Sequence, residues 1–585
     1  MVTLAKLTDE SYRLELNYKN SQPAELTKLV AAKNDKAAFQ LIVQSDIHYS
    51  VSITRGEWFS DFAKQFVGKA NDKHERIRVD IKAPFDAKLH HVGFVPDDDE
   101  ILKTDIILNQ DVIEQYANMP SVVWAEVDVP EDAKPGNYEV EVFIYLSNYC
   151  EAEKLVQSFK VPLTVYDYQL ANSKDWNFYL DLWQHNCNLA RKSDVILWSD
   201  EHFEVIRNYA KSLADLGQKS ISILVSEVPW AGQYCYKDCI YRGNLFEYSY
   251  IPITKKKDGT FVYDYSIMQK CIDTYTAEGI CGDIEVFGLV NIWKLKGIHE
   301  APLCEEYPEN IILRYYDESD GLMKYVTELE VIKDYIRSLE QYFIKTGQID
   351  RVRIAADEPG DVERYRASLE MLKELAPAFK GDCAINHANF IGEFGDMIDV
   401  FVPYLRCTLK EYDTLMKYKK EDPSKRFLWY ICCGRYTHPN TFICSLPIES
   451  RIIGLMTAYL KLDGFARWSY TIWSDDPRKD VRHSAFEAGD TLFVYPATNG
   501  RPLLSLRYKN LQRGIADFEL LKAYREKMGD EKADALIKSL LRFESIQDYF
   551  SPTGKGMKSD VNELFATAWE DYNNYKEEML KAISK

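Results

Sequence analysis

The sequence has no long hydrophobic run and no excess of positive charge. No segment approaches the roughly 20 apolar residues of a membrane-spanning helix, and the N-terminal "MVTLAKLTDESYRLELNYKN" contains no apolar signal-peptide core. We therefore expect no membrane partner and a cytoplasmic location. The 72 Lys and Arg against 91 Asp and Glu give a formal net charge of −19. Because this charge repels phosphate backbones and no basic stripe offsets it, we also expect no nucleic-acid partner.

Motifs that hold common cofactors are missing as well. No GxGxxG, P-loop, HExxH or GxSxG occurs in the context that each needs. The 12 cysteines are scattered, and the close pairs Cys235–Cys239 and Cys432–Cys433 lack a second pair at zinc-site spacing. We therefore expect buried or reduced thiols, no metal and no cofactor. No sequence feature specifies an oligomeric state.

The first part of the chain reads as all-β. The segment "SVVWAEVDVPEDAKPGNYEVEVFIYL" (121–146) alternates apolar and polar residues on both sides of the turn "PEDAKPGN". This pattern predicts a hairpin of two half-buried strands. Because there is little helical periodicity before residue 170, we expect residues 1–170 to form a β-sandwich domain.

The character changes after residue 175, where short apolar runs alternate with long amphipathic segments. Eight strand candidates lie at 177–183, 220–226, 284–290, 351–358, 383–388, 399–405, 427–433 and 464–470. This alternation predicts a (β/α)8 TIM-like barrel over residues 171–510, with a doubly wound sheet as the alternative. We expect the remaining residues, 511–585, to be helical and to pack on the barrel.

Polar and aromatic side chains gather where the predicted strands end. The active site of such a barrel forms at the carboxyl ends of its strands. The residues there include Trp183, His185, Asn291, Trp293, Asp357, Glu358, Asn386, His387, Tyr404, Trp468, Tyr470 and Trp473. Aromatic rings stack on sugar rings, and amides and acids read hydroxyl groups, so this set favours a carbohydrate pocket. The alternative for His185 and His387 is a purely structural role. At least one of Trp429 and Tyr430, which lie inside a strand, is expected to belong to the core.

The adjacent acids Asp357 and Glu358 are the strongest catalytic candidates. As the alternative, they could simply favour the positive end of the following helix, although Asp361 already provides a natural N-cap. Neighbours on a strand point to opposite faces, but Pro359 ends the strand and lets the backbone turn. Adjacent acids suit a mechanism in which the 2-acetamido group of the substrate is the nucleophile better than one with a protein nucleophile.

Several motifs together resemble glycoside hydrolase family 123 and the related domain of unknown function 4091. They are "LDLWQH", "DEP", "LWYICCGRYTHPN", "DGFARWSYTIWSDDP", "AGDTLFVYP", "SLRYKNLQRGIADFELL" and, in the first part, "VPEDAKPGNYEVEV". The similarity covers nearly the whole chain, and the run from Asp463 to Leu521 is its most specific part.

The resemblance implies an exo-acting β-N-acetylgalactosaminidase that retains configuration through an oxazoline intermediate. Asp357 would stabilise the acetamido group, and Glu358 would be the general acid, its pKa raised by the charge of Asp357. The sugar subsite would be walled by aromatics, and weaker candidates would read hydroxyl groups. The walls are Trp183, Trp468, Tyr470 and Trp473, and the hydroxyl readers are His185, Asn386, Tyr404 and Asp490.

Two departures leave the sugar open. Asn186 stands where related sequences often have Pro, and Thr471 where they often have Asn. The expected partner is a small glycan or oligosaccharide. The alternatives are another β-hexosaminide or β-galactoside, such as a glycoside of N-acetylglucosamine or galactosamine, or a non-catalytic glycan-binding protein with a degenerate barrel. The intact acid pair argues against the last.

Overall fold

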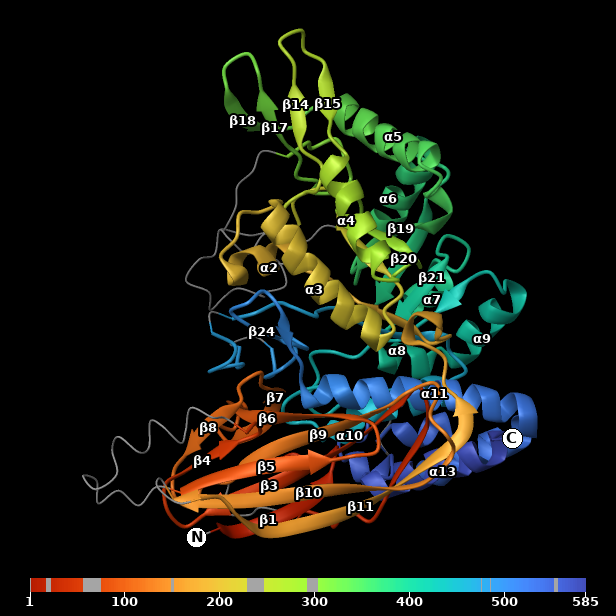
Figure 1. Cartoon of the computed structure of the whole chain (residues 1–585). Helices are drawn as coiled ribbons and strands as arrows, with labels where there is room; N and C mark the ends of the chain where they lie inside the picture. The colour runs from red at the N-terminus through yellow and green to blue at the C-terminus, as the bar shows by residue number, and fades with distance from the viewer. Residues whose placement is uncertain are drawn as a thin grey trace.

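The structure is a computed structural model that describes residues 2–16, 23–55, 75–148, 152–228, 247–291, 303–474, 476–483, 486–551 and 556–584. It confirms a mixed α/β protein with several sheets (Figure 1). Cys235, Cys239 and Trp293 lie outside the described residues. Within the described part, no helix is long and apolar enough to cross a bilayer.

Two sheets make up the N-terminal part. The first is antiparallel, in the order β1 (Val2–Asp9), β3 (Asp35–Ser45), β9 (Ser121–Val129), β6 (Asp86–Pro96) and β7 (Leu102–Ile107). The second runs in the order β2 (Leu29–Lys33), β11 (Lys154–Gln169), β10 (Gly136–Asn148), β5 (Glu75–Lys82), β4 (Tyr49–Ser52) and β8 (Val112–Gln115). Phe39 and Val127 of the first sheet share one hydrophobic cluster with Val79 and Val142 of the second.

The predicted hairpin at 121–146 is wrong. Its two strands exist, but β9 pairs with β3 and β6, whereas β10 pairs with β5 and β11. The segment between them therefore crosses from one sheet to the other. Alternation shows that a strand has one apolar face, but it does not say which strand is its partner, and β9 and β10 place their apolar faces on the same core from opposite sides.

β9 is also more buried than a half-buried strand. Its second face carries Trp124 and Glu126, and both side chains are buried. Trp124 belongs to a small cluster with Leu506, the first residue of the long helix α11 (Leu506–Met528). Glu126 is paired with Lys509 and Arg513 of the same helix. The sheet is therefore covered on both faces.

All eight predicted strands of the second part are present as parallel strands. They are β12 (Tyr179–Leu182), β13 (Ile221–Leu224), β16 (Ile284–Phe287), β19 (Val352–Asp357), β20 (Lys380–Ile385), β21 (Val400–Pro403), β22 (Arg426–Phe427) and β23 (Gly464–Arg467). β13 to β22 pair in chain order, and β12 pairs with β23. Isolated parallel bridges then join Leu180 to Gln218 and Tyr430 to Ala466. The carboxyl ends of these strands consequently lie at one end of the assembly.

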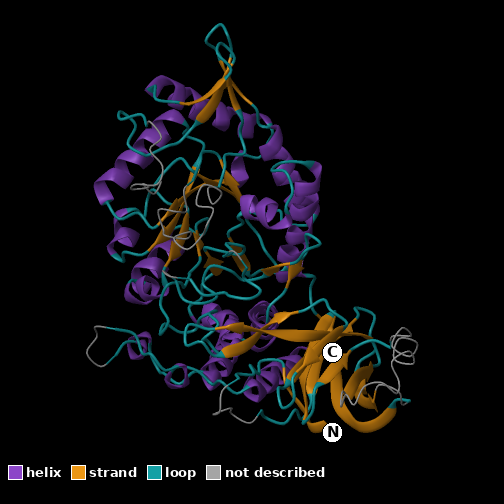
Figure 2. Cartoon of the chain, turned by 90° about the vertical axis from the view of Figure 1, so that its left-hand side faces the viewer, coloured by secondary structure: helices purple, strands orange, loops and turns teal. Residues whose placement is uncertain are grey.

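Helices surround these strands (Figure 2). They are α2 (Asn186–Ser193), α3 (Asp200–Leu216), α4 (Ser266–Ala277), α5 (Leu329–Lys345), α6 (Val362–Leu375), α7 (Asn389–Glu393), α8 (Leu405–Lys410), α9 (Tyr412–Glu421) and α10 (Pro447–Tyr459). Capping places some of their ends: the side chain of Asp361 accepts from the backbone N–H of Arg364 at the start of α6. This confirms Asp361 as the N-cap of α6, so neither Asp357 nor Glu358 caps this helix.

A small four-stranded sheet was not predicted. It contains β15 (Phe261–Tyr263), β14 (Ile253–Lys255), β17 (Arg314–Asp317) and β18 (Leu322–Tyr325), in that order. It is built from the segments that follow β13 and β16, and it stands at the end of the molecule far from the N-terminal sheets (Figure 1). Strands of three or four residues are too short to give a readable alternation.

The C-terminal helices connect the two parts. They are α11 (Leu506–Met528), α12 (Asp530–Leu540) and α13 (Trp569–Ile583), and two short strands, β24 (Tyr495–Pro496) and β25 (Pro502–Leu503), precede them. α11 packs on α10 and α13 and also touches β7. It lies between the N-terminal sheets and the parallel strands (Figure 1). The predicted boundary after residue 510 falls inside α11, since no helix-breaking residue separates the two sides.

Candidate active site

Glu358 is turned out of its strand by the backbone. β19 ends at Asp357, and Glu358 has a φ of 51°, in the left-handed region that non-glycine residues rarely adopt. Its N–H still donates to the carbonyl oxygen of Ala384 on β20, at 3.0 Å. This kink removes the strand alternation that would otherwise send the two acids to opposite faces. Strain of this kind in a non-glycine residue concentrates at functional sites.

Two neighbouring strand ends hold the carboxyl group of Glu358. Asn386, after β20, donates from Nδ2 to Oε2 at 2.9 Å, and the Tyr430 hydroxyl donates to Oε1. Burial raises the pKa of Glu358, and the charge of Asp490 adds to this, while the hydrogen bonds from Tyr430 and Asn386 and the nearby His387 act in the other direction. The raised pKa thus arises first from burial, and not from the charge of Asp357 that the resemblance implies.

Tyr430 is the site residue that sequence reasoning missed. The sequence predicts only that at least one of Trp429 and Tyr430, inside a strand, belongs to the core. The structure separates them: Trp429 is fully buried and its indole N–H donates to Thr457 of α10, whereas the hydroxyl of Tyr430 reaches Glu358. Strand alternation between neighbours was the signal that could have found it.

The main chain of Asp357 is hydrogen-bonded to the segment that follows β16. The side-chain amide of Asn291 donates to the main-chain oxygen of Asp357. Asn291 itself has a left-handed φ of 46°. Asp357 and Glu358 are both partly exposed, in contrast to the three buried residues just before them, Ile354 to Ala356. The acid pair can therefore meet a ligand from solvent.

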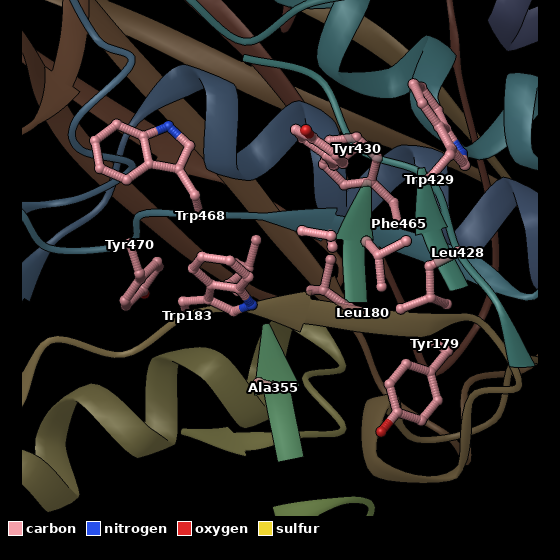
Figure 3. Close-up of a cluster of buried hydrophobic side chains, with 14 of the residues drawn as sticks. Tyr179, Leu180, Trp183, Ala355, Leu428, Trp429, Tyr430, Phe465, Trp468 and Tyr470 are labelled. Atoms are coloured by element: carbon pink, nitrogen blue, oxygen red, sulfur yellow. The ribbon is translucent and has the colours of Figure 1, made fainter. Parts of the chain in front are cut away.

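Trp183 and Trp468 lie together at the ends of β12 and β23 (Figure 3). The indole N–H of Trp183 donates to Asp181 at 3.2 Å, and its ring meets Phe287 edge-on with centroids 4.9 Å apart. The indole N–H of Trp468 donates to Asp490 at 3.1 Å. Both rings are thus held by a buried carboxylate.

His185 bonds the main chain of Trp468. Its Nε2 lies 3.0 Å from the carbonyl oxygen of Trp468, so this nitrogen carries the proton and donates. Burial lowers the pKa of His185 to about 4, which keeps the imidazole neutral at ordinary pH. Asp490 is fully buried, and its two oxygens accept from Trp468 and from the backbone N–H of Cys433. Both side chains are therefore hydrogen-bonded to Trp468.

The other two predicted wall residues are engaged in packing. Tyr470 is 1% exposed, and its hydroxyl lies 2.7 Å from that of Ser212 on α3. Trp473 is 2% exposed, and its indole N–H donates to the carbonyl oxygen of Val494. Tyr404 lies closer to the acids, because its ring centroid is 5.5 Å from that of Tyr430 and its hydroxyl donates to Thr437.

The first departure from the related sequences has a structural role. Asn186 is fully buried, its Nδ2 donates to the Tyr250 hydroxyl at 3.1 Å, and its Oδ1 accepts from the Tyr275 hydroxyl at 2.7 Å. At Thr471, the second departure, the main-chain oxygen accepts from the Asn188 side chain. Within the described residues, no three His, Cys, Asp or Glu side chains are grouped as metal ligands.

Comparison with known proteins adds a family match. The model of the glycoside hydrolase 123 catalytic domain matches residues 183–524. Among solved structures, a family 123 glycoside hydrolase from Clostridium perfringens, studied for glycolipid glycan hydrolysis, superposes with a TM-score of 0.73 at 17% identity, covering 99% of this chain and 97% of that one. The comparison with curated proteins finds no match.

More distant structures are also found. A β-D-glucuronidase of Dictyoglomus thermophilum has a TM-score of 0.30 at 11% identity, covering 87% of this chain and 68% of that one. An endo-β1,6-glucanase has a TM-score of 0.32 at 13% identity, covering 60% and 77%.

Proposed function

We propose, from the premise that this chain belongs to glycoside hydrolase family 123, that it is an exo-acting, retaining β-N-acetylgalactosaminidase. The observation that carries this proposal is the half-buried acid pair at the end of β19, in which Glu358 is turned by its backbone and held by Asn386 and Tyr430. As the substrate class we propose a small glycan, including the glycan of a glycolipid, by analogy with the Clostridium perfringens enzyme.

The architecture that we propose is an N-terminal β-sandwich followed by a (β/α)8 barrel and C-terminal helices. The shared core of the two N-terminal sheets supports the first part. The parallel pairing in chain order, together with the bridges Leu180–Gln218 and Tyr430–Ala466, supports the second. In such a barrel the acid pair lies on the face that carries active sites.

The proposed mechanism uses the 2-acetamido group of the sugar as the nucleophile. Its carbonyl oxygen bonds to C1 while the bond from C1 to the leaving oxygen breaks, and Glu358 gives its proton to that oxygen. Asp357 orients and polarises the acetamido N–H, which stabilises the oxazolinium ion. Water then adds to C1, Glu358 takes a proton from it, and the oxazoline reopens, so that configuration is retained. Burial supports the role of Glu358, because a general acid must stay protonated near working pH.

Trp183 and Trp468 are the aromatic walls that we propose for the sugar subsite, with Asn386 and Tyr404 near the acids. Tyr470 and Trp473 are proposed as support behind these walls, since their polar atoms bond α3 and Val494. The alternative function is hydrolysis of another β-hexosaminide or a β-galactoside.

A panel of 4-nitrophenyl glycosides tests the substrate. We expect release of nitrophenol from the N-acetyl-β-galactosaminide, with the α-anomer inert and the C4 epimer, the N-acetyl-β-glucosaminide, slower. A faster reaction of the epimer would replace the proposed sugar by N-acetylglucosamine. Binding of these glycosides without any turnover would instead favour the non-catalytic glycan-binding protein.

Replacing Tyr430 by Phe should move the alkaline limb of the pH profile to higher pH. The Tyr430 hydroxyl stabilises the ionised form of Glu358, so its loss raises the pKa of the acid further. A hydrogen bond to a charged group is worth about 1.5–3 kcal/mol, which corresponds to a shift of about one to two pH units. The kcat/KM profile from pH 4 to pH 9 measures it. Tyr404→Phe, whose hydroxyl bonds Thr437, is the matched control, and a limb that moved to lower pH would contradict the assignment.

A further inference from the structure

Asp490 is a buried carboxylate with a partner on each oxygen. Its Oδ1 accepts from the Trp468 indole N–H at 3.1 Å and lies 3.6 Å from Nη1 of Arg467. Its Oδ2 accepts from the backbone N–H of Cys433 at 3.0 Å. Because Asp490 is completely buried, both of its oxygens are engaged inside the protein and are not free to read a sugar hydroxyl.

These contacts join two strand ends that meet at the acid pair. Trp468 follows β23, and Cys433 lies three residues after Tyr430, which donates to Glu358. Cys433 has a left-handed φ of 54°, a conformation that its bond to Asp490 holds. Arg467 closes the arrangement, because its Nη2 also donates to the main-chain oxygens of Gly489 and Asp490.

The charge of Asp490 is one of several influences on the pKa of Glu358. Burial and the charge of Asp490 oppose ionisation of Glu358, whereas Asn386 and Tyr430 favour it. The other titratable groups that face Glu358 are His387 after β20, Cys383 on β20, Cys407 on α8, and Cys432 and Cys433 after β22. The groups that face Asp490 are Arg467, Tyr404, Cys432 and Cys433.

We propose that Asp490 is a positioning residue that fixes the Trp468 indole and the chain at Cys433, three residues after the tyrosine that donates to Glu358. This inference rests on the proposed function for its catalytic meaning, but its two structural parts can be measured without any substrate. It replaces the earlier expectation that Asp490 reads a sugar hydroxyl.

The first test is NMR on full-length protein. In protein labelled with δ-13C glutamate, Glu358→Gln identifies the Glu358 signal by its disappearance. We expect Asp490→Asn to lower the pKa of Glu358, because a like charge that opposes its ionisation is removed while Arg467 stays. In 15N spectra, Trp468→Phe identifies the Trp468 indole N–H, which should shift in Asp490→Asn, while that of Trp473, bonded to Val494, should not.

The conservative variant Asp490→Glu keeps the charge but moves the carboxylate by one methylene. We expect it to shift the Trp468 indole signal and to leave the Glu358 pKa nearly unchanged. It serves as the test if Asp490→Asn does not fold. An unmoved indole signal in both variants would overturn the positioning role, and an unmoved Glu358 pKa in Asp490→Asn would overturn the charge role.

The kinetic test links the residue to catalysis. On the N-acetyl-β-galactosaminide, Asp490→Asn should move the alkaline limb of kcat/KM to lower pH, whereas Trp468→Phe should lower kcat/KM by about tenfold without moving the limb. If Asp490 had only a structural role, Asp490→Asn would lower kcat/KM but leave its alkaline limb at the wild-type pH. That result would overturn the proposal. If the wild type cleaves none of the glycosides while the NMR shifts occur, the proposed function fails and the inference about Asp490 stands.

Discussion

Replacing Glu358 by Gln lowers kcat/KM by about 10²–10⁴-fold, the range that a general acid contributes. The effect is largest on an oligosaccharide, since its leaving oxygen needs the proton more than nitrophenolate does. The variant should still fold, because Gln keeps an oxygen for the Tyr430 hydroxyl. Its new NH2 group faces Asn386, whose Oδ1 has no hydrogen-bond partner among the described residues and can accept after an amide flip.

The matched control is Glu363→Gln, the same change five residues further along the chain at an exposed position of α6. We expect this variant to keep the wild-type rate. Initial rates on a β-linked N-acetylgalactosamine disaccharide and on the aryl glycoside, with thermal midpoints for both variants, make the measurement. Wild-type activity in Glu358→Gln would remove the acid from the mechanism, and unchanged glycan affinity without turnover in either protein would favour a binding protein.

The second large effect is on stability, at the contact between β9 and α11. Glu126 accepts from Lys509 at 2.8 Å and from Arg513 at 2.9 Å, and the three side chains are at most 9% exposed. Removing the carboxylate takes away the partner of the buried Lys509, while Arg513 keeps its bond to Glu10, and breaking a buried pair in this way costs about 3–5 kcal/mol. We therefore expect Glu126→Gln to lower the free energy of unfolding by this amount, measured by urea denaturation. Glu139→Gln is the control, because Glu139 pairs with Lys160 at the surface, and it should leave the midpoint unchanged.

The same residue predicts a pH dependence. Burial raises the pKa of Glu126, but the charges of Lys509, Arg513 and Lys36 outweigh it and hold the pKa below the ordinary range. A group with a depressed folded pKa stabilises the protein above its unfolded pKa of about 4.3 and loses this contribution as the pH falls. The wild type should therefore lose stability below about pH 4 more steeply than Glu126→Gln. Parallel curves for the two proteins would contradict this account.

The sequence was informative wherever one residue pattern implies one local structure. The eight apolar runs after residue 175 predicted β12 to β23, and Asp361 after Gly360 predicted the N-cap of α6. Which strands pair with each other could not be predicted in this way. The strands at 121–146 have the right alternation for a hairpin, yet they belong to two sheets, because partner choice depends on the tertiary packing around Val127 and Val142.

The site was predictable in outline. The acid pair, Asn386 and Trp468 follow from the rule that strand ends carry function. Alternation places Trp429 and Tyr430 on opposite sides, but only the structure shows that Tyr430 is the one that reaches Glu358. The packing roles of Tyr470 and Trp473 likewise became visible only once α3 was placed. Similarly, the buried state of Asp490 depends on a turn that no periodic pattern predicts.

The central claim is that the substrate supplies its own nucleophile. The most direct measurement compares kcat/KM for the 4-nitrophenyl N-acetyl-β-galactosaminide with that for the 4-nitrophenyl β-galactoside, which differs at C2 alone. An intramolecular nucleophile in near-attack geometry replaces a bimolecular step, so we predict a preference of about 10³-fold or more for the acetamido substrate. Equal rates on the two substrates would contradict the mechanism.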